Sequence, residues 1–151
     1  MTRIPAAAPA LVLALALAAA PAFAAPAAYA TPQDALDAMI AALQARDRAA
    51  ALTVFGPEAE DLIYSGDPDT DAEHREKLLE AYGEGYRFAP RTEGGVQILF
   101  GADGWPFPIP LVRDGATWHF DIEAGRDELA DREIGLNELD IIELMGAYVD
   151  L

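Results

Sequence analysis

The chain has no cysteine among its 151 residues. It therefore forms no disulfide, offers no thiol nucleophile or thiolate metal ligand, and has no cysteine to carry a lipid anchor. The fold must be held together by its hydrophobic core, and any site must be built from other side chains.

Basic residues are scarce as well. Ten Lys and Arg residues stand against 26 Asp and Glu residues, which gives a formal net charge of −16. Because such a charge is repelled by nucleic acids and by anionic membrane surfaces, the sequence predicts that the protein binds neither of them. The acidic residues are scattered rather than run together, which indicates a solvated surface.

The familiar catalytic motifs are missing. The chain has no HExxH zinc motif, no GxSxG nucleophile elbow, no P-loop and no dinucleotide fingerprint. We therefore expect no cofactor, and the sequence favours a protein that is not an enzyme.

Charge is also absent from a long N-terminal stretch. After Arg3 no charged residue occurs over residues 4–32, and a leucine-rich run occupies residues 11–17. Small-x-small cleavage signals follow at residues 22–24 and 28–30. This pattern is typical of a bacterial secretory signal peptide, whereas the many alanines and the prolines do not suit a spanning helix.

These features predict the domain organisation. We expect a signal peptide over residues 1–24, a linker over residues 25–30 and a single α+β domain over residues 31–151. Cleavage also removes Arg3, so the mature chain would carry 9 basic and 26 acidic residues, a net charge of −17. The expected location is the periplasm or the medium, with no membrane span after cleavage.

Helices are predicted in the first part of the domain. Capping residues and prolines favour helix starts at residues 31–32 and at Asp47, and glycines favour stops. The spacing of apolar residues predicts helices over residues 31–46, 47–56 and 72–82, with a short helical turn over residues 57–63.

An acidic turn is predicted before the helix at residues 72–82. Asp67, Asp69 and Asp71 are candidate calcium ligands, since calcium prefers oxygen donors. However, the twelfth position of such a loop is Leu78 rather than an acid, so helix capping and turn formation are favoured. Asp71 also stands four residues before Arg75, the spacing of a helical ion pair.

About four antiparallel strands are predicted after the helices, over residues 86–89, 96–100, 105–113 and 116–122. The dipeptide Asp114-Gly115 favours a two-residue hairpin turn, with Leu111 opposite Trp118 on an apolar face. Trp118 is therefore expected to anchor the core. The outward prolines at residues 106, 108 and 110 predict that the strand over residues 105–112 lies at a sheet edge, or is covered on its proline side only by groups that donate hydrogen bonds.

Helical patterns return after the sheet. A short helix is predicted over residues 124–132, and Asn137 can cap a last helix. That helix carries an apolar stripe formed by Leu139, Ile142, Met145 and Val149. Because the stripe is broad, we expect part of it to bind a second copy or another envelope protein.

His119 and Asp121 are the candidate catalytic residues. They share one face of a strand, and a histidine oriented by a carboxylate can act as a general acid or base. The predicted register places both opposite the apolar face, which favours a solvated pair.

The string from Trp105 to Val112 (WPFPIPLV) is the most specific of five segments that resemble domain-of-unknown-function family 2950 (DUF 2950). The others occupy residues 31–35, 62–68, 118–121 and 134–139. The resemblance implies an exported bacterial protein without assigned catalytic residues, whose relatives usually continue into a second half. More loosely, helices followed by a curved antiparallel sheet resemble NTF2-like domains.

The leading hypothesis is a non-catalytic binding module of the cell envelope. It would bind another envelope protein or a small apolar ligand held between helices and sheet. One alternative is a small cavity enzyme that uses His119 and Asp121. The other is a truncated family member that lacks its functional second half.

Overall fold

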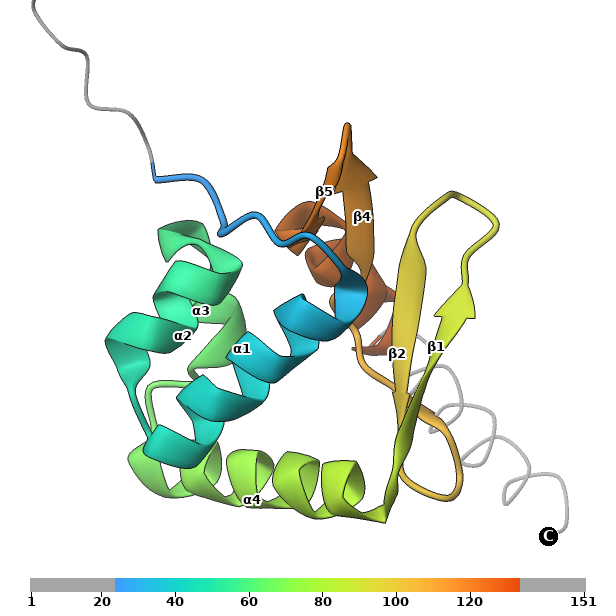
Figure 1. Ribbon diagram of the computed structural model, residues 1–151. Coiled ribbons are helices and arrows are strands. Elements are labelled where there is room, and N and C mark those ends of the chain that lie inside the picture. The colour runs from blue at the N-terminus through green and yellow to red at the C-terminus, as the bar shows by residue number, and fades with distance from the viewer. Residues whose placement is uncertain (1–23, 134–151) are drawn as a thin grey trace, which may run out of the picture.

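A computed structural model describes residues 24–133 of the chain (Figure 1). Helices come first and an antiparallel sheet follows, which confirms the predicted α+β class. Within the described range, no helix combines the length and the apolar character that crossing a membrane requires. The last helix predicted after Asn137, with its partner surface, lies outside the described residues, as does nearly all of the predicted signal peptide.

The helices of the first part are α1 (Pro32–Ala45), α2 (Arg48–Phe55), the 3₁₀ helix η1 (Pro57–Ala59), α3 (Glu60–Ile63) and α4 (Pro68–Glu84). Two predicted caps are confirmed. The hydroxyl of Thr31 accepts a hydrogen bond from the backbone N–H of Asp34 at 3.1 Å. The carboxylate of Asp47 accepts one from the N–H of Ala50 at 3.0 Å, and so satisfies an amide at the start of α2.

Helix α4 begins four residues earlier than predicted. Asp67 is its N-cap, and its carboxylate accepts hydrogen bonds from the N–H of Asp69 at 3.1 Å and from the hydroxyl of Thr70 at 2.8 Å. Pro68 takes the first helical position, where its missing N–H costs nothing. The predicted acidic turn is therefore the first turn of α4.

The sheet has five strands rather than about four: β1 (Tyr86–Pro90), β2 (Val96–Phe100), β3 (Trp105–Pro106), β4 (Leu111–Asp114) and β5 (Thr117–Phe120). Their order is β1-β2-β4-β5, and β3 also pairs with β2. The predicted third strand is split because residues 107–110 leave the ladder. Two prolines in that stretch, Pro108 and Pro110, have no N–H to donate to a neighbouring strand.

The prediction of an edge strand over residues 105–112 holds for β3, whose one strand partner among the described residues is β2, and is wrong for β4, which lies between β2 and β5. The N–H of Phe107 donates to the carbonyl of Ile98 at 2.8 Å. The backbone of the preceding residue, Pro106, therefore points away from β2, so its missing N–H breaks no hydrogen bond between the two strands. Its carbonyl accepts a hydrogen bond from the guanidinium of Arg132 at 2.9 Å.

The register of the hairpin between β4 and β5 also differs from the prediction. Asp114 pairs with Thr117, so the two turn residues are Gly115 and Ala116, and Leu111 lies opposite Phe120. A shift of two residues leaves the same side chains on the apolar face. The predicted face is thus correct, but Phe120 is completely buried whereas Trp118 is only half-buried.

The core lies between α1, α2 and the inner face of the sheet. Phe55 of α2 packs on Phe120, with ring centroids 4.7 Å apart, and lies 6.4 Å from Phe107. Gly95 permits close packing of β4 on β2, since a Cβ at this position would lie 2.3 Å from the carbonyl oxygen of Leu111. The other large buried side chains are Leu36, Met39, Ile40, Val54, Ile98, Phe100, Ile109, Leu111 and Ile122.

The segment predicted as a linker, residues 25–30, packs against the domain (Figure 1). The N–H of Tyr29 donates to the carbonyl of Trp118 at 2.8 Å, and the N–H of Trp118 donates back at 2.7 Å. Ala27 donates to the carbonyl of Thr53 at 3.1 Å. The segment therefore adds a short bridge to β5 and a contact to α2.

Candidate functional site

A cleft of about 850 Å³ opens between the helices and the segment that joins β3 to β4. Helices α1 to α4 line it together with Trp105, residues 107–109 and Leu129. Its volume lies within the range of roughly 300–1,000 Å³ that is common for small-molecule sites.

The walls of the cleft are largely apolar. Met39 and Phe55 line it from α1 and α2, and Phe107 and Ile109 line it from the opposite side. All four side chains belong to the core, so the cleft reaches down to the packed centre of the domain. Its half-buried apolar residues are Leu43, Leu62, Ile63, Leu78, Ala81 and Leu129.

Basic residues outnumber acidic residues in the cleft, whereas acidic residues predominate in the whole chain. Four of the ten basic residues line it, namely Arg46, Arg48, Arg75 and Lys77, together with His74. Only two of the 26 acidic residues do so, Asp47 and Asp71. The cleft thus has a formal charge of 4 − 2 = +2 in a chain of −16.

Both acidic residues of the cleft are engaged by the fold. Asp47 caps α2, and the carboxylate of Asp71 accepts hydrogen bonds from Ser65, at 2.8 Å from its N–H and 2.7 Å from its hydroxyl. These bonds, the one from the backbone N–H foremost, hold the pKa of Asp71 below its usual value. The ion pair expected between Asp71 and Arg75 does not form.

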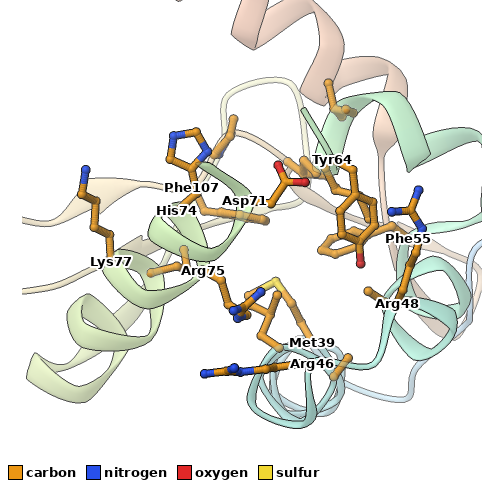
Figure 2. A pocket seen from close by; sticks show the side chains of 18 of the residues that line it. Met39, Arg46, Arg48, Phe55, Tyr64, Asp71, His74, Arg75, Lys77 and Phe107 are labelled. Atoms are coloured by element: carbon orange, nitrogen blue, oxygen red, sulfur yellow. The ribbon is translucent and has the colours of Figure 1, made fainter. Parts of the chain in front are cut away.

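The four cations differ in their surroundings. Arg48 pairs with Glu60, which raises the pKa of the guanidinium, and it lies 4.0 Å from the centroid of the Tyr64 ring. Within residues 24–133, no carboxylate lies within 4.0 Å of Arg46, Arg75 or Lys77. Figure 2 shows Arg46 and Arg75 beside Met39, and Arg48 next to Tyr64.

His119 and Asp121 line a second, smaller hollow of about 230 Å³. The carboxylate of Asp121 accepts a hydrogen bond from the N–H of Ala124 at 3.1 Å, at the start of the helix described over residues 122–133. No hydrogen bond joins His119 to Asp121 in the described part of the chain. The structure thus brings the two predicted residues to one hollow, with the carboxylate engaged in helix capping.

The three candidate metal ligands lie at the start of α4. Asp67 caps the helix and Asp71 binds Ser65, so two of the carboxylates already accept hydrogen bonds. Over residues 24–133 there is no cluster of three or more His, Cys, Asp or Glu side chains suited to a metal ion.

The hypothesis of a small apolar ligand held between helices and sheet anticipated an apolar site, but sequence reasoning did not locate the cleft or give any basic residue a role in it. Its residues come from four helices and a strand connection, and no local motif links them. The one available signal is the pairing of basic residues two positions apart, at residues 46 and 48 and at residues 75 and 77, in a chain with few of them. Only the packing of α1 against α4 brings these pairs to one cleft.

The fold and the cleft define a small α+β domain that contains a large apolar cleft. The family model described as "Protein of unknown function (DUF2950)" matches residues 26–151, and the chain belongs to this family. No curated protein and no solved structure matches the chain. The resemblance to NTF2-like domains therefore stays a prediction.

Proposed function

We propose that this protein is an exported, non-catalytic binding module whose cleft holds a small apolar ligand. The observation that carries the proposal is the cleft of about 850 Å³, which has apolar walls and lies between the helices and the connection from β3 to β4. A concave apolar site suits a small molecule better than a flat protein partner.

The energetics of burial support an alkyl or similar ligand. Each methylene that leaves water contributes about 0.8 kcal/mol, and association costs at least about 4 kcal/mol. A chain of roughly ten buried carbons contributes about 8 kcal/mol, which exceeds the lower bound of that cost. The volume of the cleft accommodates a ligand of this size.

The non-catalytic part of the proposal is supported by the position of His119 and Asp121. Both lie outside the cleft, in the smaller hollow, and the carboxylate of Asp121 caps a helix. No hydrogen bond joins His119 to Asp121 in the described part of the chain, so the carboxylate does not orient the imidazole as an acid–base pair requires. A ligand in the cleft would not meet this pair.

Export is supported by the charge-free stretch over residues 4–32 and by its two cleavage signals. Cleavage after Ala24 keeps Tyr29, whereas cleavage after Ala30 would remove its two hydrogen bonds with Trp118. We therefore expect processing at Ala24. Mass spectrometry of the protein exported from a bacterial host tests this, and an intact Met1 would contradict it.

Ligand binding is tested with the neutral fluorophore N-phenyl-1-naphthylamine and its displacement by dodecan-1-ol. Leu78→Trp fills part of the cleft, and Leu79→Trp is the matched control, since the adjacent Leu79 is half-buried but does not line it. We expect Leu78→Trp to weaken probe binding by about tenfold, as for the loss of two buried methylenes. The control should bind like the parent protein.

Circular dichroism and thermal unfolding establish that both variants fold. Absence of probe binding to the folded parent protein would overturn the proposal. Equal binding by the two folded variants would also overturn it, because the probe would then sit elsewhere.

A further inference from the structure

The charges around the cleft indicate which class of apolar ligand it takes. Resting on the proposed function, we infer that the ligand is a single-chain amphiphile with an anionic head, a carboxylate or a phosphate, and that Arg46 and Arg75 hold this head. The alkyl chain lies against the apolar walls.

The distribution of charge over the chain is the first argument. The net charge of −16 repels an anion from most of the surface, yet the cleft has four basic residues and two acidic ones. Local positive potential in a hollow with apolar walls attracts anions and concentrates them there. A cationic amphiphile would be attracted to the acidic groups on the rest of the surface rather than to the cleft.

The placement of the two arginines is the second argument. Arg46 follows the last turn of α1 and Arg75 lies on α4, so they reach the cleft from two different walls. In Figure 2 both guanidinium groups lie on the side of Met39. Two guanidinium forks can together donate several charge-assisted hydrogen bonds to one carboxylate or phosphate.

The backbone at Arg46 adds an independent observation. Its φ of 54° lies in the left-handed region, and no other described residue except glycine has a positive φ. Glycine is the least strained residue after the last turn of a helix. A ligand-binding role of the Arg46 side chain at the cleft would account for an arginine at this strained position.

The lack of internal partners is the fourth argument. No carboxylate within residues 24–133 lies within 4.0 Å of Arg46 or Arg75. Asp71, which has the spacing to pair with Arg75, binds Ser65 instead. The fold therefore leaves these two cations available to an external anion, while Arg48 is already paired with Glu60.

The apolar walls near the two arginines match the rest of an amphiphile. Met39 lies beside the arginines, and Phe55 and Phe107 continue the wall toward the core. A chain that extends along them should bind about fourfold more tightly for each methylene added, until the cleft is filled.

Isothermal titration calorimetry of the chain from residue 25 to residue 151 tests the inference, with four ligands below their micelle concentrations. Dodecanoate and dodecyl phosphate are anionic, dodecan-1-ol is neutral and dodecyltrimethylammonium is cationic. We expect the anions to bind about tenfold more tightly than the alcohol, and the cation to bind most weakly. Added salt should weaken the anions alone.

Variants locate the head group. Arg75→Gln and Arg46→Gln should each weaken dodecanoate by about three- to tenfold, since these groups are partly solvated, and leave the alcohol unchanged. Arg75→Lys should restore part of the affinity. Arg113→Gln removes the same charge from an exposed position on β4 outside the cleft, and it should have no effect.

The calorimetry distinguishes a failure of the anionic-head inference from a failure of the proposed function. Equal affinity for dodecanoate and dodecan-1-ol would overturn the anionic head and leave the proposed function standing, whereas failure of every ligand to bind would overturn both. An equal loss from Arg113→Gln and Arg75→Gln would also contradict the inference, because the attraction would then come from overall charge. The ratio of dodecanoate to dodecyl phosphate shows which of the two heads fits.

Discussion

The cleft and the smaller hollow both have Phe55 in their walls, and they differ in what their polar groups do. In the smaller hollow, the carboxylate of Asp121 is occupied by the first turn of a helix. In the larger cleft, Asp47 caps α2 and Asp71 accepts hydrogen bonds from Ser65, but Arg46 and Arg75 have no acidic partner among the described residues. The difference shows that residue types alone do not make a site.

What distinguishes a site is the set of polar groups that the fold leaves unsatisfied. Amides at the start of a helix need acceptors, and an aspartate placed before the helix supplies one. Asp47, Asp67 and Asp121 are used in this way. The guanidinium groups of Arg46 and Arg75, in contrast, form no ion pair within the described residues.

The largest expected effect comes from the wall itself. Phe55 is 3% exposed and packs on Phe120, so Phe55→Ala should lower the free energy of unfolding by about 3–5 kcal/mol and join the two hollows. Urea unfolding measures the loss. A loss below about 1 kcal/mol would mean that the hollows are not separated by a packed wall.

Trp118→Ala should have a smaller effect. The side chain is half-buried rather than buried, and its hydrogen bonds with Tyr29 come from the backbone, which the variant keeps. We expect a loss of about 2 kcal/mol, well below the loss for Phe120→Ala, which removes a fully buried ring. Urea unfolding of the two variants provides the comparison, and equal losses would restore Trp118 as the main anchor.

The smaller hollow should be structural. Asp121→Ala removes a helix cap and should cost about 1 kcal/mol, whereas His119→Ala should change stability by less than about 0.5 kcal/mol. Neither variant should alter the affinity for dodecanoate. If His119→Ala abolished ligand binding, the smaller hollow would be the site and the comparison would be reversed.

The smallest effect concerns Asp71 and pH. Its hydrogen bonds with Ser65 lower its pKa in the folded state below the ordinary value of 3.8. This carboxylate therefore contributes stability above its unfolded pKa, and the contribution is lost as the pH falls through the folded pKa. The thermal midpoint of Asp71→Asn should fall less than that of the parent between about pH 5 and about pH 2. Parallel curves would contradict this.

The local rules of the chain predicted most of the fold. Caps at Thr31 and Asp47 fixed the first helices, and the apolar alternation fixed which face of the hairpin is buried. The register itself depended on whether the turn used Asp114-Gly115 or Gly115-Ala116, and both choices bury the same face. The local pattern could not decide between them.

These local rules could not predict the candidate site. The breaks at residues 107–110 and the pairing of β3 with β2 depend on contacts between distant segments. The cleft depends on them too, since Arg46 and Arg75 come together only through the packing of α1 on α4. Periodicity and capping say nothing about such juxtapositions.

The most direct test of the central claim is methyl NMR of the protein labelled at the methionine methyl groups, titrated with dodecanoate. Met39 lines the cleft beside the two arginines, and Met39→Leu identifies its signal. We predict that the Met39 signal shifts in proportion to the binding measured by calorimetry, and that it shifts far less in Arg46→Gln/Arg75→Gln at the same ligand concentration. Binding of dodecanoate with an unmoved Met39 signal would contradict the account.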